Sequence, residues 1–247
     1  MDAQSTSSAP GWRLGLFALA FALLGGVVGW FWQAHRAGAG NRAAIEQVVH
    51  DYVLANPEIL PEAMANLRKR EDAKQLAGVS ADLKRPFPGA VLGNPDGKVT
   101  LVEFSDFACT YCRQSETEVA ALIQSNPDLK VVIRQLPILS PASADAARMG
   151  LAAARQGRYA AYHRAMYSGG RPDAASIDSA ARAAGLDMAR AQKDIADPGI
   201  AAEIDRNLEF ARKLGFEGTP SWVIGEEMHA GAVGHDVLAA AIKKARG

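Results

Sequence analysis

The chain has 247 residues, and its 27 basic and 27 acidic side chains leave a formal net charge of zero. This balance provides no general attraction for a polyanion, so no nucleic-acid partner is expected. Because 49% of the residues are hydrophobic, most of the chain should fold around a packed core. Only two cysteines are present, which excludes a scaffold held by several disulfides.

An apolar segment precedes the part expected to be globular. After an N-terminal tail, residues 1–13, residues 14–32 carry no charged side chain. As a helix they would extend about 28 Å, close to the thickness of the hydrocarbon core of a bilayer. We predict a single-pass anchor in the inner membrane, with the rest of the chain in the periplasm. A cleaved signal peptide is the alternative, since Ala37-Gly38-Ala39 matches an A-x-A site; the product would then be a soluble periplasmic protein.

Residues 41–80 are predicted to form a helical extension. Gly38–Asn41 should be a flexible exit, with Asn41 as the N-cap of the first helix. Pro57 and Pro61 should separate this helix from a second one, because both cannot lie in one helix interior. Each helix has a narrow apolar stripe with no nearby partner in the sequence. The stripes either pack on the main domain or join copies of the chain, and we favour a homo-oligomer.

The rest of the chain alternates between strands and helices. Residues 84–97 are rich in Pro and Gly and predict a joint. The elements expected after it are a strand (99–104), a helix from Cys109, a strand (130–138), an all-helical block (about 141–215), two strands within 221–234 and a helix (235–246). The first strands require a parallel crossover and the last two form an antiparallel hairpin. The fold class is therefore α/β, with a mixed sheet and an inserted helical subdomain.

The two cysteines, Cys109 and Cys112, form a C-x-x-C pair directly after the first strand. A structural disulfide would close a very small loop and constrain the unfolded chain little. Zinc would need further ligands, and the five histidines have no ligand spacing, so no metal site is predicted. A redox-active dithiol fits best. Cys109, at a helix N-terminus, would be the attacking thiolate, and Cys112 would resolve the mixed disulfide.

Two further positions support a redox site. Pro220 directly precedes a predicted strand, where a cis Thr219–Pro220 bond would leave the Thr219 backbone free to pair with an extended peptide. Glu103 lies in the apolar first strand, and by alternation it could point inward and relay the proton of Cys112. The alternatives are a trans proline that opens an edge strand and a glutamate that faces solvent.

From about Pro88 onward, the chain resembles the DsbA family of thioredoxin-fold proteins. The resemblance rests on the sequence VEFSDFACTYC, on GTP before a strand and on the helical insertion between them. It implies a thioredoxin-like domain over residues 88–247 and periplasmic thiol–disulfide exchange, with Cys109 and Cys112 forming the redox disulfide, Pro220 as the cis proline and Glu103 as the buried acid. The preceding YVLANPEILPEAM resembles the N-terminal extension of ScsC-like members, which in some cases drives oligomerisation.

The residues between the cysteines depart from the family's strong oxidases, which carry Pro-His there. This chain has Thr110 and Tyr111, which we place with Thr219 and Pro220 in the substrate-binding set. Without an imidazole to stabilise the thiolate, a less oxidising couple is expected. We therefore predict an isomerase, reductase or mild oxidase without a cofactor. Its partners would be exported proteins with cysteines and a membrane protein that recycles the dithiol. A redox-regulated peptide-binding chaperone and a Cu(I)-handling dithiol are the alternatives.

Overall fold

The computed structural model describes residues 12–246, apart from the side chains of residues 12–14 and 34–41. The predicted tail, residues 1–13, lies outside the described residues except for the first two residues of a helix. By internal contacts the chain divides into two compact units, residues 1–65 and 66–247.

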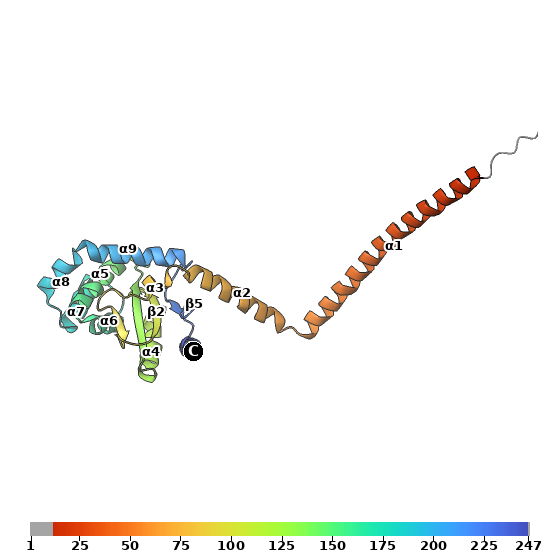
Figure 1. Ribbon diagram of the computed structural model, residues 1–247. Helices are drawn as coiled ribbons and strands as arrows, with labels where there is room; N and C mark the ends of the chain where they lie inside the picture. The colour runs from red at the N-terminus through yellow and green to blue at the C-terminus, as the bar shows by residue number, and fades with distance from the viewer. Residues whose placement is uncertain (1–11, 247) are drawn as a thin grey trace, which may run out of the picture. The chain divides into compact units, whose positions relative to one another are not determined.

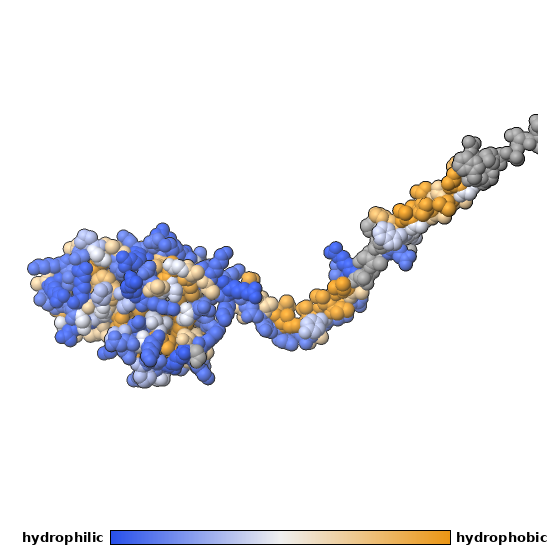
Figure 2. Space-filling model, in the orientation of Figure 1, coloured by the Kyte–Doolittle hydropathy of each residue, from blue (hydrophilic) through white to orange (hydrophobic). Residues whose placement is uncertain are grey.

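The first unit is dominated by one long helix, α1 (Trp12–Ala55). Its segment Gly15–Gln33 has a mean hydropathy of 1.9 and is long and apolar enough to cross a membrane, a test that a signal sequence also passes. Figure 2 shows this apolar stretch in orange along the helix. The flexible exit and the Asn41 cap were wrong predictions, because α1 runs through residues 38–41 without a break. Glycine costs only about 1 kcal/mol relative to alanine in a helix interior, and the surrounding alanines favour the helix.

The second helix, α2 (Ile59–Leu76), spans the division between the units. Pro61 lies in its first turn, where a proline is tolerated. In the first unit, Leu60 and Met64 are exposed. In the second unit, Leu76 is buried, and Asp72 Oδ2 accepts a hydrogen bond of 3.1 Å from the backbone N–H of Met228. The end of α2 therefore packs on the rest of the second unit, whereas Leu60, Met64 and Leu67 of the predicted apolar stripe are exposed, and the partner of this stripe stays a prediction.

The predicted mixed sheet is confirmed, and it has five strands in the order β1-β3-β2-β4-β5. The strands are β1 (Val91–Gly93), β2 (Val99–Ser105), β3 (Leu129–Gln135), β4 (Ser221–Ile224) and β5 (Glu227–Ala230). The central pair β2 and β3 is parallel, and the other pairs are antiparallel. Sequence analysis missed β1 and assigned it to the Pro/Gly-rich joint. This strand has only three residues, and its order depends on pairing with β3 rather than on a local pattern.

Helices cover both faces of the sheet (Figure 1). Between β3 and β4 lies the helical insertion, which consists of α5 (Pro141–Arg155), α6 (Tyr159–Ser168), α7 (Ala174–Ala183), α8 (Met188–Ile195) and α9 (Pro198–Lys213). The remaining helices of this unit are α3 (Ser80–Leu83), α4 (Thr110–Ser125) and α10 (His235–Ala245). Leu101 of β2 belongs to a core with α4 to α10, and its neighbour Val102 belongs to a second core with α3 and the C-terminal part of α9. Alternate residues of β2 thus serve opposite faces.

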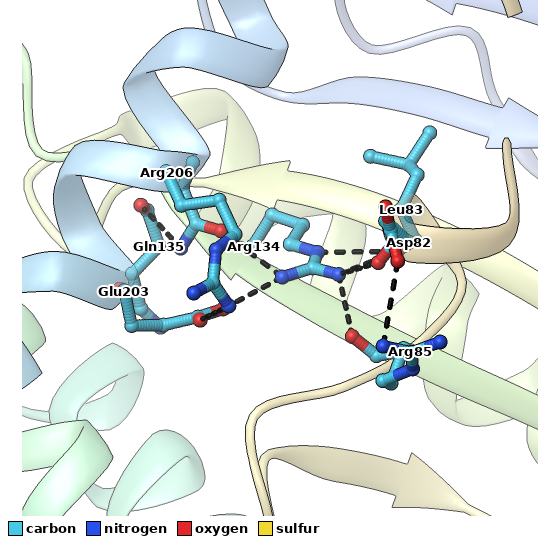
Figure 3. Close-up of polar contacts among 8 residues, drawn as sticks. Asp82, Leu83, Arg85, Arg134, Gln135, Glu203 and Arg206 are labelled. Atoms are coloured by element: carbon cyan, nitrogen blue, oxygen red, sulfur yellow. Dashed lines mark hydrogen bonds and ion pairs between the residues drawn. The ribbon is translucent and has the colours of Figure 1, made fainter. Parts of the chain in front are cut away.

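A buried arginine links two segments that pack in the second core. Arg134 of β3 is only 1% exposed and lies between the turn at residues 82–85 and helix α9 (Figure 3). Its guanidinium donates to the carbonyls of Asp82 and Leu83 at 2.6 and 2.8 Å, and to Glu203 Oε1 at 2.6 Å. The planar fork of arginine suits such a multidentate site. Arg134 therefore fixes the segment that enters the thioredoxin-like domain against the helical insertion.

Candidate dithiol active site

The loop between β2 and α4 is held by a buried aspartate, Asp106. Its Oδ1 accepts from the backbone N–H of Ala108 at 2.8 Å, and its Oδ2 accepts from the N–H groups of Ile138 and Leu139 at 2.9 Å each. Its carbonyl accepts from the N–H of Cys109 at 2.9 Å. Sequence analysis did not single out Asp106. The available signal was an aspartate in a short strand-to-helix link, where this side chain commonly accepts backbone N–H bonds.

This loop delivers Cys109 to the N-cap of α4, where its side chain is 4% exposed. Its Sγ accepts from the backbone N–H of Cys112 at 3.3 Å and donates to the carbonyl of Thr219 at 3.1 Å. The hydrogen bond from the Cys112 thiol, helped by the N–H groups of Tyr111 and Cys112, lowers the pKa of Cys109 to about 6 against the opposing effect of burial. Cys109 is therefore largely a thiolate at neutral pH, and the thiolate is the nucleophile.

Cys112 lies within the first turn of α4 and is fully buried. Burial, the hydrogen bond it donates to Cys109 and the nearby charge of Glu103 raise its pKa far above that of a free thiol. Both cysteines are free thiols, so the structure is that of the reduced state. The two sulfurs are thus chemically unequal, since one is ready to attack and the other holds its proton.

The residues predicted to bind substrate surround Cys109. The Thr219–Pro220 peptide bond is cis, and the Thr219 carbonyl faces the Cys109 sulfur. Thr110 and Tyr111 begin α4 and are exposed, Tyr111 at 61%. The fold therefore brings these four residues to one place. Their contact with substrate stays a prediction.

Glu103 points inward from β2 and is fully buried, between Ile133 of β3 and Trp222 of β4 in the strand register. Neither carboxylate oxygen has a hydrogen-bond partner within the described part of the chain. Burial, followed by the charge of Glu116, raises the pKa of Glu103 well above its usual range. A carboxylate whose pKa is raised is a better proton acceptor, which is a property that a relay requires.

The aromatic cluster of α6 is part of the core. Tyr159, Tyr162, Met166 and Tyr167 are all buried, so they pack in the core and do not line a surface groove. His163 is also buried, and its Nδ1 lies 3.2 Å from Glu116 Oε2 of α4. Within the described residues, no group of three or more His, Cys, Asp or Glu side chains is placed to hold a metal ion.

A low-pKa thiol at a helix N-terminus, a buried second thiol and a buried carboxyl group can together exchange disulfides. The fold and this dithiol define the class of thioredoxin-fold thiol–disulfide exchange proteins. The sequence model of the thioredoxin family matches residues 88–244, and the chain belongs to that family. The model described as the N-terminal domain of the copper resistance protein ScsC matches residues 41–74. The resemblance to ScsC-like members of the DsbA family is thereby confirmed.

Two solved thioredoxin-like structures and one curated protein are similar to this chain. A thioredoxin-like oxidoreductase of Silicibacter pomeroyi is 41% identical, with a TM-score of 0.61, over 63% of this chain and 91% of that chain. A periplasmic thioredoxin-like protein of Salmonella enterica serovar Typhimurium is 31% identical, with a TM-score of 0.60, over 68% and 95%. The Na(+)/H(+) antiporter NhaA 1 of Salinispora arenicola is 30% identical over 190 residues, 73% of this chain. The chain spans only 29% of the length of that antiporter.

Proposed function

We propose that the protein is a membrane-anchored disulfide isomerase or reductase that acts on exported proteins in the periplasm. The observation that carries this proposal is the pair of unequal thiols. Cys109, with a pKa of about 6, would attack a substrate disulfide, and Cys112 would then displace the substrate by closing the Cys109–Cys112 disulfide. A membrane redox partner would return the pair to the dithiol.

The direction of exchange depends on how strongly the Cys109 thiolate is stabilised. A lower pKa of the nucleophile stabilises the reduced form and makes the protein a stronger oxidant. The value of about 6 for Cys109 is closer to the thioredoxin value of ≈ 7 than to the DsbA value of ≈ 3.5. Thr110 and Tyr111 contribute no cationic side chain between the cysteines. Both facts favour reduction or isomerisation over strong oxidation.

The N-terminal helices support the proposed location and assembly. An exposed apolar helix of membrane-spanning length and similarity to a periplasmic thioredoxin-like protein support an anchored, periplasm-facing domain. Ile45, Val48 and Tyr52 are each at least 60% exposed on α1, which supports self-association through this stripe. In sedimentation measurements in detergent, Val48→Asp should lower the oligomeric state. A wild-type monomer would refute the assembly.

The redox potential of the Cys109–Cys112 couple tests the direction. The full chain in detergent is equilibrated with glutathione buffers, and the dithiol fraction is measured by alkylation and mass spectrometry. A potential near or below about −180 mV is expected for an isomerase or reductase, whereas a value near −120 mV belongs to a strong oxidant and would refute the direction. In parallel, Cys112→Ala should trap mixed disulfides through Cys109. Cys109→Ser should trap none at position 109 and should abolish exchange.

A second candidate function is Cu(I) binding by the dithiol, and the description of the family that matches residues 41–74 favours it. Cysteine thiolates are soft ligands that suit Cu(I). Titration of the reduced protein with Cu(I) under a competing chelator should show one metal per dithiol, and Cys109→Ser should abolish it. Intact disulfide exchange in the presence of saturating Cu(I) would contradict binding at this pair.

A further inference from the structure

A buried pair of hydroxyl groups, from Ser105 and Tyr167, lies against the loop that carries Cys109. Ser105 is the last residue of β2, and Tyr167 lies near the C-terminal end of α6. Both side chains are buried, and their hydroxyl oxygens are 2.6 Å apart. At this distance and depth the two groups share a hydrogen bond for which water does not compete.

Ser105 faces the same core as Cys112. By the alternation of β2, its side chain lies on the face of Leu101 and Glu103, and Leu101 and Cys112 belong to one core cluster. The Ser105 hydroxyl is near enough to lower the pKa of Cys112 through hydrogen bonding. A negative charge on Cys112 in turn raises the pKa of Tyr167. Both hydroxyl groups therefore respond to the charge of the Cys112 sulfur.

The two hydroxyl protons have more than one acceptor. In one arrangement Tyr167 donates to the backbone carbonyl of Asp106, 3.2 Å from its oxygen, and Ser105 donates to Tyr167. In the other arrangement Tyr167 donates to Ser105, and the proton of Ser105 is free to point to another acceptor. The Asp106 carbonyl keeps a partner in both, because it also accepts from the N–H of Cys109 at 2.9 Å.

The second arrangement suits a negative charge on Cys112. Burial raises the pKa of Tyr167 well above its usual value, so this hydroxyl keeps its proton and stays a donor at neutral pH. A hydrogen bond from Tyr167 polarises the Ser105 hydroxyl and strengthens the bond that Ser105 can donate. Burial and the charge of Glu103 otherwise disfavour a thiolate at Cys112. A fixed donor contributes most at such a position, where charge develops and water is excluded.

We propose that Ser105, held and polarised by Tyr167, donates a hydrogen bond to the Cys112 thiolate as that sulfur resolves a mixed disulfide. This inference rests on the proposed function, because only resolution creates that thiolate. Ser105 donates to the reacting sulfur, whereas Tyr167 acts through Ser105 and is a positioning residue. No proton leaves either hydroxyl group in this step, and only the acceptors of their hydrogen bonds change.

The bonds and protons balance as follows from the dithiol chemistry. Cys112 Sγ–H gives its proton to the Glu103 carboxylate while the Ser105 O–H turns from Tyr167 to the sulfur. The Cys112 thiolate attacks Cys109 Sγ, and the Cys109–Cys112 disulfide forms. The bond between Cys109 and the substrate breaks, and the substrate leaves as a thiolate. The Cys112 sulfur is then neutral, and the hydroxyl protons return to their first arrangement.

The expected direction of the effect separates this role from an effect on Glu103. The Ser105 hydroxyl also lowers the pKa of Glu103. Its removal would by that route make Glu103 a stronger proton acceptor and would speed resolution. Loss of a donor to the Cys112 thiolate has the opposite effect, because the thiolate becomes harder to form. Slower resolution in Ser105→Ala therefore reports on the thiolate.

The test follows capture and resolution separately in the full chain in detergent. The substrate is a peptide whose single cysteine carries a thionitrobenzoate disulfide, so attack by Cys109 releases thionitrobenzoate and leaves the peptide on the protein. Acid quenches the reaction at set times, and mass spectrometry measures the mixed disulfide. In Ser105→Ala and in Tyr167→Phe, its formation should stay within about twofold of wild type, while its decay at pH 7 should slow by about tenfold. Ser105→Thr, which keeps the hydroxyl, should decay faster than Ser105→Ala.

A double variant tests whether Tyr167 acts through Ser105. Ser105→Ala combined with Tyr167→Phe should decay no more slowly than Ser105→Ala alone, because the tyrosine then has no hydroxyl to polarise. Tyr162→Phe is the matched control. It removes another buried hydroxyl of α6, which donates to the Ala146 carbonyl at 3.1 Å, and it should leave both steps unchanged.

Three results would overturn the proposal. They are unchanged or faster decay in Tyr167→Phe, equal slowing of formation and decay in that variant, and losses that add in the double variant. Equal slowing would mean that Tyr167 only holds the loop through the Asp106 carbonyl. A wild-type protein that forms no mixed disulfide would refute the proposed function instead.

Discussion

The ionisation of Cys109 depends mainly on Cys112, so Cys112→Ala should raise the pKa of Cys109. The structure lowers this pKa from 9.0 to about 6, a shift of about three pH units, and the hydrogen bond from the Cys112 thiol is the largest cause. Three units correspond to about 4 kcal/mol. A hydrogen bond to a charged group contributes about 1.5–3 kcal/mol. Loss of the thiol should therefore raise the pKa by about one to two units.

The assay is the rate of alkylation of the reduced protein by iodoacetamide between pH 4 and pH 10, read by mass spectrometry at Cys109. The wild-type rate should reach half its maximum near pH 6, and the rate of Cys112→Ala should do so at about pH 7–8. Ser125→Ala, at the far end of α4, is the matched control and should titrate as wild type. A Cys112→Ala protein that still titrates near pH 6 would refute the reasoning, because the backbone N–H groups of the helix would then suffice.

The same ionisation links stability to pH. The folded pKa of Cys109 is lower than the unfolded value, so the thiolate stabilises the reduced protein above the unfolded pKa, and this stability is lost as the pH falls through about 6. Between pH 5 and pH 8 the reduced wild type should gain about 2–3 kcal/mol from this group, and Cys112→Ala only about 1 kcal/mol. Urea unfolding of the reduced proteins measures both values. Equal pH dependence in Cys109→Ala and wild type would contradict the linkage.

Three further predictions concern the rest of the chain. Glu103→Gln should slow the attack of Cys112 on the mixed disulfide. It should also stabilise the fold at pH 7 but little at pH 4, because the raised pKa of Glu103 in the folded state makes its ionisation costly above the unfolded pKa. A lower melting temperature of Glu103→Gln than of wild type at pH 7 would contradict this effect on stability. Arg134→Met should destabilise by about 3 kcal/mol, because the buried Glu203 would keep only the exposed Arg206 as an ionic partner, whereas Arg206→Met should cost at most about 1 kcal/mol; equal losses in urea unfolding would refute the difference. Removal of residues 1–34 should move the protein from the membrane fraction to the soluble fraction, and retention in the membrane would exclude α1 as the anchor.

Local sequence patterns predicted the parts of the site that local structure creates. The apolar strand followed by C-x-x-C placed Cys109 at the N-cap of α4, and a proline directly before a strand indicated the cis bond at Pro220. Alternation along β2 indicated the inward orientation of Glu103. In each case a few neighbouring residues determine the backbone, so the pattern is visible without the fold.

The missed features depend on contacts between distant parts of the chain. Asp106 binds the backbone 32 and 33 residues later, and Arg134 joins a turn 51 residues earlier to a helix 69 residues later. The strand β1 exists through pairing with β3, and the ion pair of Glu116 and His163 joins two helices, α4 and α6, that are separated in the sequence by β3 and α5. No periodicity or spacing in the sequence encodes such pairings, so only the folded arrangement reveals them.

The asymmetry between the thiols also determines which chemical step depends on proton transfer. Cys109 lies before the first turn of α4, where free N–H groups and the Cys112 thiol stabilise its negative charge. Cys112 lies inside that turn and faces the buried Glu103, so its ionised form is disfavoured by both burial and charge. Attack by Cys109 therefore needs no proton acceptor at neutral pH, whereas attack by Cys112 does. Resolution is then the step that the buried carboxyl controls. Release of a bound substrate should respond to changes at Glu103 while its capture by Cys109 does not.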